Sequence, residues 1–121
     1  MNLGLPYESE VIRAVDSTQS IFESLGCIVE EAEPNLADAD EIFKAWRAWS
    51  FEAGLSAEYQ IHKEQLKDTV IWNIEQGLSL TGPQLARLEI KRTQLYHRLR
   101  EFMQRYEFMI LPVSQVLFRS T

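Results

Sequence analysis

Residues 9–34 constrain the fold of this chain more than any other segment. Apolar residues recur there at alternating steps of four and three, which predicts a helix over residues 9–25. Gly26 can end that helix in the left-handed conformation, and the β-branched run at residues 27–32 predicts a strand. Helix, glycine and strand form the second half of a βαβ unit. Residues 1–4 leave no room for the preceding strand, so we expect the chain to start within a larger fold.

The middle of the chain is predicted to be helical. Apolar spacing predicts a helix that starts at Asp38 or Asp40 and runs to about Ala53, and a short helix at about residues 56–64. Two further helices are predicted at residues 68–78 and 83–106. The second of these has a strong start signal, because a capping threonine, Thr81, is followed by glycine and proline.

A second strand is predicted near the end of the chain. Residues 108–111 are apolar at every position and Pro112 follows them, which indicates an interior strand of a parallel or mixed sheet. The predicted fold class is therefore mainly α, or α+β, with about four helices and one or two short strands. Two short strands leave residues 108–111 poorly covered, which again suggests a larger fold.

Composition excludes several classes of protein. A length of 121 residues suits a single domain over residues 1–121. A net charge of −6 and a pI of about 4.9 argue against nucleic acid as a partner. We expect no membrane partner, because no apolar run approaches the ~20 residues of a membrane span. With no signal peptide and one cysteine, Cys27, the expected location is the cytoplasm.

Few residues suggest chemistry. Glu58 and His62 lie four apart, but a metal site in a helical bundle needs such pairs on several helices. Cys27 stands among apolar residues of a predicted strand, where a thiol behaves as a small hydrophobe. Glu30 and Glu31 point to opposite faces of that strand, which favours solvated carboxylates over an acid–base pair. We therefore predict no catalytic residue, no metal site and no cofactor.

The tryptophans are the most unusual feature of the sequence. Trp46 and Trp49 lie three residues apart and share a helical face with Phe43, and Trp72 belongs to the next predicted long helix. Two interpretations remain open. These rings either pack in the core or form the wall of a ligand pocket.

Several strings, taken in order over about residues 3–113, resemble the later part of the amidase signature family. The most specific of them is the Trp-Asn-Ile-Glu-Gln-Gly stretch. The matching strings are Leu3-Gly4-Leu5-Pro6, Leu25-Gly26, Ile28-Val29-Glu30-Glu31-Ala32-Glu33-Pro34, Arg47-Ala48-Trp49-Ser50, Val70-Ile71-Trp72-Asn73-Ile74-Glu75-Gln76-Gly77-Leu78, Arg92-Thr93-Gln94-Leu95-Tyr96 and Tyr106-Glu107-Phe108-Met109-Ile110-Leu111-Pro112.

This resemblance implies an α/β amidase fold, of which the chain holds the helical cap and a sheet-edge segment. The family hydrolyses amides with a Ser–cis-Ser–Lys triad that lies within and ahead of a Gly/Ser-rich stretch, N-terminal to the matched region. This chain has no such stretch, and none of its lysines matches the catalytic one. The resemblance therefore implies a pocket wall rather than a triad, and Trp49, Trp72 and Gln76 are the residues we expect in that wall.

Two functions from different classes follow. The first is a fragment of an amidase-family hydrolase, inactive alone, whose full enzyme cleaves a small-molecule carboxamide to a carboxylate and an amine or ammonia. The second is a stand-alone helical protein-interaction module without catalysis. The fragment hypothesis predicts self-association, because residues 108–111 and the tryptophan face lack their natural cover.

Overall fold

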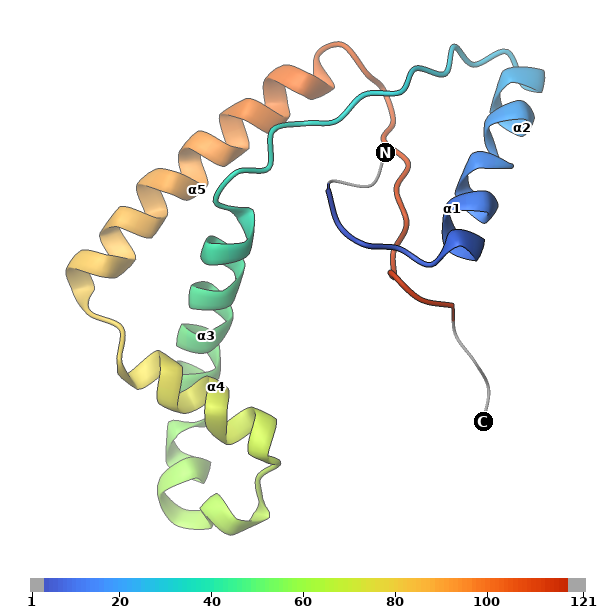
Figure 1. Ribbon diagram of the computed structural model, residues 1–121. Helices are drawn as coiled ribbons and strands as arrows, with labels where there is room; N and C mark the ends of the chain where they lie inside the picture. Colours follow the sequence, from blue (N-terminus) through green and yellow to red (C-terminus); the bar gives the residue numbers. More distant parts are fainter. Residues whose placement is uncertain (1–3, 118–121) are drawn as a thin grey trace. The chain divides into compact units, whose positions relative to one another are not determined.

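The computed structural model describes residues 4–117, and they are mainly helical, as predicted (Figure 1). Residues 1–3, where the sequence leaves no room for a preceding strand, lie outside this range. The described helices are α1 (Ser9–Asp16), α2 (Gln19–Ser24), α3 (Ala39–His62), the 3-10 helix η1 (Lys63–Gln65), α4 (Asp68–Leu78) and α5 (Gly82–Met103).

The chain divides into two compact units. Unit 1 consists of Met1–Pro34 and Met103–Thr121, and unit 2 consists of Asn35–Phe102. The single domain expected from the chain length stays a prediction.

The helix predicted over residues 9–25 is in fact two helices. Two hydroxyl side chains at the break bond back to the helix: Ser17 Oγ donates to the Ala14 carbonyl at 2.8 Å and Thr18 Oγ1 to the Val15 carbonyl at 2.7 Å. Such bonds compete with the backbone ladder, which explains the interruption. The predicted role of Gly26 is confirmed, because its φ is +88° and α2 ends just before it.

The two predicted strands do not form within residues 4–117. Residues 4–117 contain no strand, and both segments are extended without a partner strand. Ile28 in the first segment is 92% exposed and Phe108 in the second is 82% exposed. A strand exists only when another strand accepts and donates its backbone hydrogen bonds, and no described segment does so. The α/β sheet that the amidase resemblance implies is therefore absent from residues 4–117.

Helix α3 runs unbroken through Gly54, where the sequence suggested a gap between two helices. It has 24 residues and joins the segments predicted at residues 38–53 and 56–64. One glycine within a helix costs only about 1 kcal/mol relative to alanine. Good helix formers on both sides of Gly54 offset that cost.

The core of unit 2 is the packing of α3 against α4. Ile74 on α4 is fully buried, and Ala48 on α3 is 4% exposed. Gly77 lies at the closest approach, since a Cβ there would stand 2.4 Å from the Ala48 carbonyl oxygen. Gly77 is the penultimate residue of α4, and its lack of a side chain permits the two backbones to approach.

The start of α5 is close to the prediction. Thr81 and Gln84 form a reciprocal cap: the Thr81 amide donates to Gln84 Oε1 at 2.8 Å, and the Gln84 amide donates to Thr81 Oγ1 at 3.4 Å. The helix ends at Met103, three residues before the predicted end at Tyr106.

Candidate functional site

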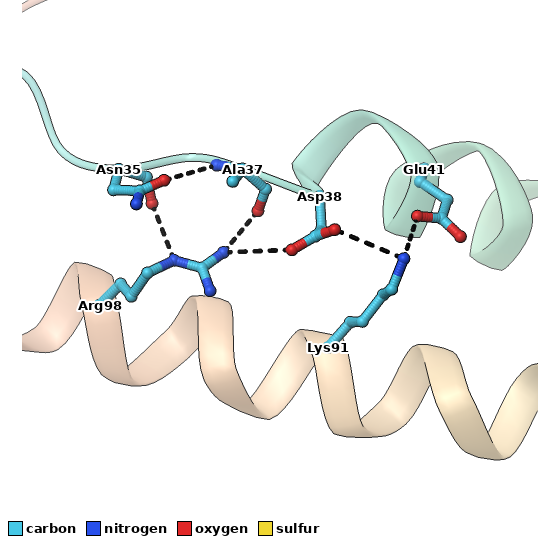
Figure 2. A network of polar contacts seen from close by, with 6 residues as sticks. All are labelled: Asn35, Ala37, Asp38, Glu41, Lys91 and Arg98. Atoms are coloured by element: carbon cyan, nitrogen blue, oxygen red, sulfur yellow. Dashed lines mark hydrogen bonds and ion pairs between the residues drawn. The ribbon is translucent and has the colours of Figure 1, made fainter.

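The most extensive polar arrangement in unit 2 joins α5 to the segment that leads into α3 (Figure 2). Arg98 donates from Nε to the Asn35 carbonyl at 3.2 Å and from Nη2 to the Ala37 carbonyl, and it pairs with Asp38 at 3.6 Å. Lys91, two turns earlier on α5, pairs with Asp38 at 3.4 Å and with Glu41. We call Asn35, Ala37, Asp38, Glu41, Lys91 and Arg98 the polar network.

The polar network holds a strained residue. Asp38 has φ 70° and ψ −8° and is the described non-glycine residue with positive φ. The left-handed conformation costs a non-glycine residue about 1–2 kcal/mol, so its surroundings must compensate. Arg98 does this mainly through its hydrogen bonds to the Asn35 and Ala37 carbonyls, and the ion pairs of Arg98 and Lys91 with the Asp38 carboxylate add to it.

The charges of the polar network neutralise one another. Two cations face two carboxylates, and the hydrogen bond to Glu41 is the main reason that the pKa of Lys91 is raised above its ordinary value. Lys91 therefore stays protonated at neutral pH and cannot act as a general base. The arrangement suits positioning rather than catalysis.

A second polar cluster ties the end of α3 and η1 to α4. Tyr59 Oη donates to Glu75 Oε1 at 2.9 Å, and Lys63 Nζ lies 2.9 Å from the same oxygen and 3.0 Å from Tyr59 Oη. Hydrogen bonds to Tyr59 and Glu75 raise the pKa of Lys63, and the hydrogen bond from Lys63 is the main cause of the lowered pKa of Glu75. Both groups remain charged near pH 7, so Lys63 is no better a base than Lys91.

The predicted pocket residues lie on unit 2 and are exposed. Trp49 on α3 is 38% exposed and Trp72 on α4 is 52% exposed. Gln76 is exposed one turn after Trp72 on the same side of α4. None of the three lines either of the two depressions described below. Their role in a pocket wall stays a prediction.

The tryptophan face is partly packed. The rings of Trp46 and Trp49 meet edge to face, with centroids 5.0 Å apart and planes at 87°. The Arg92 guanidinium lies 5.5 Å from the centre of the Trp46 ring and pairs with Glu89 at 3.1 Å. Phe43, on the same sequence face, is 61% exposed. The indole N–H of Trp46 is buried and has no hydrogen-bond partner among residues 4–117.

Two depressions are open to solvent, one on each unit. The depression on unit 1 is lined by apolar residues of α1 and of residues 110–117. The depression on unit 2 is lined by Glu41, Ala45, Leu80, Gln84, Arg87, Leu88 and Lys91. The lining of unit 1 is Val11, Ala14, Val15, Thr18, Ile110, Leu111, Pro112, Val113, Ser114, Val116 and Leu117.

Other residues considered from sequence do not form a site. Glu58 and His62 are both exposed on α3. Within residues 4–117 no group of three or more His, Cys, Asp or Glu side chains is placed to bind a metal ion. Cys27 is exposed. Cys27 was expected to behave as a small hydrophobe within a strand, but within residues 4–117 no sheet is present to cover it.

The polar network was not predicted from the sequence. Lys91 and Arg98 lie seven residues apart on one face of α5, which is two helical turns, and Asp38 and Glu41 are three apart. That spacing was the available signal. No sequence pattern predicts the left-handed conformation of Asp38, because that conformation depends on Arg98, which is distant in the sequence.

Comparison with models of protein families, with curated proteins and with solved structures found no match. Among residues 4–117, no helix combines the length and apolar character needed to cross a membrane.

Proposed function

We propose that this chain is the helical, pocket-shaping region of an amidase-signature hydrolase and is inactive alone. The main support for the proposal is that far more large apolar side chains are exposed than buried. Among the described residues, 20 large hydrophobic side chains are exposed, whereas the buried hydrophobic ones are Val11, Ile42, Ala48, Ile74 and Leu88. Apolar surface on this scale marks a face that another protein segment covers.

The extended segments support a sheet as the missing cover. Ile28 and Val29 are β-branched, and Phe108 begins a run of four apolar residues, yet all three are exposed. No backbone hydrogen bond is made by Ile28, Val29 or Phe108 within the described residues. Extended apolar backbone with open hydrogen-bonding groups is the usual template for pairing with a strand.

The inactivity of the isolated chain follows from its chemistry. Amide hydrolysis by this family adds water across the C–N bond through an acyl-serine and gives a carboxylate and an amine or ammonia. It needs an activated serine and a neutral lysine. The chain lacks the Gly/Ser-rich stretch, and the pKa values of Lys63 and Lys91 are raised, which keeps both protonated. In the proposal, Trp49, Trp72 and Gln76 form the acyl side of the pocket.

The test joins the chain to the coding sequence that precedes Met1 in its gene. We expect that sequence to encode a Gly/Ser-rich stretch, and the joined protein to release 4-nitroaniline from 4-nitroacetanilide while the chain alone does not. Trp72→Ala should raise KM several-fold with little change in kcat, whereas Glu58→Gln, which changes an exposed polar side chain on α3, should leave both unchanged. Unrelated upstream sequence, or no turnover by the joined protein, would contradict the proposal.

The second candidate function, a stand-alone helical interaction module, is favoured by one observation. Unit 2 has internal order of its own, because Ile74 is fully buried between α3 and α4 and the polar network ties α5 to the start of α3. Sedimentation at several concentrations separates the two candidates. A chain that stays monomeric at every concentration, so that its exposed apolar side chains drive no self-association, favours the interaction module.

A further inference from the structure

We infer that the apolar groove of unit 1 binds a basic, amphipathic segment of another polypeptide. We call the depression between α1 and residues 110–117 the unit 1 groove. The inference goes beyond the proposed function, because it concerns a ligand for the side chains of this groove, whereas the proposed sheet pairs with backbone groups. Its test uses no amide hydrolysis, so the two ideas can fail separately.

The unit 1 groove has a defined construction. Val11 and Val15 of α1 form one wall, and Ile110, Leu111 and Val116 contribute to the other. Two hydrogen bonds hold the second wall beside the start of α1. The Glu8 amide donates to the Gln115 carbonyl at 2.9 Å, and the Leu117 amide donates to Glu8 Oε2 at 3.3 Å.

The size of the groove suits a short segment. Its volume is about 340 Å³. At 1.5 Å per residue the eight residues of α1 are about 12 Å long, which matches roughly two turns of a docked helix. Ile110 is 44% exposed and Val116 is 56% exposed, so apolar surface remains for an occupant. Two turns place three or four apolar side chains on one face, the usual set of anchors for a helix in a groove.

The negative charge of unit 1 favours a basic occupant of this groove over an acidic one. Unit 1 carries eight acidic and three basic residues, a formal net charge of −5, whereas unit 2 carries ten and nine, a net charge of −1. Glu8 and Glu10 stand at the start of α1, which forms one wall. A second copy brings the same −5 to the contact and is repelled, as are nucleic acid and anionic lipid. A segment with apolar residues on one face and Lys or Arg on the other complements both properties.

The test uses two synthetic 14-residue peptides, each labelled with fluorescein. Both carry Leu at helical positions i, i+3, i+4 and i+7; the remaining positions are Lys in one and Glu in the other. We expect fluorescence anisotropy to show saturable binding of the Lys peptide to the full chain. Raising NaCl from about 20 mM to about 300 mM should weaken binding about tenfold, because salt screens the attraction. The Glu peptide should not bind.

Matched neutral variants locate the contact. Leu111→Asn lies in the groove, and Ile21→Asn, exposed on α2 in the same unit, lies outside the groove lining. We expect the first variant to weaken binding of the Lys peptide at least about fivefold and the second to leave it unchanged. Far-UV circular dichroism verifies that both are folded, and because Leu111 lies outside every helix its variant should keep the helical signal. Equal binding of both peptides, equal binding by Leu111→Asn, or a dimer at low salt that Leu111→Asn abolishes would overturn the inference.

Discussion

Gly77 and Gly54 are both helical glycines, and they predict opposite effects of the same substitution. A Cβ at Gly77 would lie 2.4 Å from the Ala48 carbonyl oxygen and 2.6 Å from Glu52 Cβ, whereas a Cβ at Gly54 would meet nothing within 4 Å. Gly77→Ala should therefore force α3 and α4 apart and lower the free energy of unfolding by about 1–3 kcal/mol. Gly54→Ala should raise it by about 0.5–1 kcal/mol through helix propensity alone. Urea unfolding followed by circular dichroism measures both, and a stabilising Gly77→Ala would contradict the close packing.

Arg98 predicts a second effect at the residue scale. Removing its side chain takes away two hydrogen bonds to the Asn35 and Ala37 carbonyls and leaves Asp38 strained. Arg98→Ala should lower the free energy of unfolding by about 1–2 kcal/mol.

Asp38→Asn is the variant to compare with Arg98→Ala. Asparagine tolerates the left-handed conformation, so this change removes only partly exposed ion pairs and should cost at most about 1 kcal/mol. A larger cost for Asp38→Asn than for Arg98→Ala in urea unfolding would show that charge pairing, rather than the hydrogen bonds to backbone carbonyls, holds the entry to α3.

Single residues were predictable where the signal is local. Thr81 was expected to cap a helix and does so with Gln84. Arg92 interrupts an apolar stripe, and such a cation needs a partner or solvent; it has Glu89 and the Trp46 ring, and it is exposed. Asp38 was not predictable, because its conformation depends on a side chain 60 residues away in the sequence.

At the scale of helices and strands, the Tyr59–Lys63–Glu75 cluster predicts a pH dependence. The pKa of Glu75 is lowered from 4.5, so its contribution to stability is present above pH 4.5 and is lost as the pH falls through the lower folded value. The pKa of Lys63 is raised from 10.5, so its contribution is present below pH 10.5 and is lost as the pH rises further.

The measurement compares the thermal midpoints of wild type, Glu75→Gln and the control Glu58→Gln, which changes an exposed carboxylate on α3. We expect the gap between wild type and Glu75→Gln to be present at pH 7 and to close as the pH falls below 4.5. The gap for Glu58→Gln should stay near zero at both. A Glu75→Gln gap that persists unchanged in acid would mean that the cluster does not link η1 to α4 through charge.

The long helices could be predicted because apolar spacing along one segment is enough to specify them. The positions of α4 and α5 follow the sequence within a few residues at each end. The strands could not be settled in this way, since a β-branched run such as residues 27–32 forms a strand only when a partner backbone is present. The predicted pocket wall depends on the same missing cover and stays a prediction. Trp49 and Trp72 were placed by resemblance to enzymes that contain the sheet.

At the scale of the whole molecule, uncovered apolar surface predicts weak self-association. The net charge of −6 opposes contact between copies, and salt screens that repulsion. We therefore expect sedimentation equilibrium to show association that rises with protein concentration and strengthens from about 20 mM to about 300 mM NaCl. This salt dependence is opposite in sign to that of the basic peptide. A monomer at all concentrations and both salt levels would count against the amidase-fragment proposal.

Hydrogen exchange of the isolated chain at low concentration tests most directly whether these helices lack the sheet that covers them. We expect strong protection of the amide of Ile74, which is fully buried. We expect almost none for Ile28, Val29, Phe108 and Ile110, which are exposed on extended backbone. Under the amidase-fragment proposal, joining the chain to the coding sequence that precedes Met1 should slow exchange in residues 27–32 and 108–111 specifically. Protection of those two segments in the isolated chain, at a level close to that of Ile74, would contradict the account.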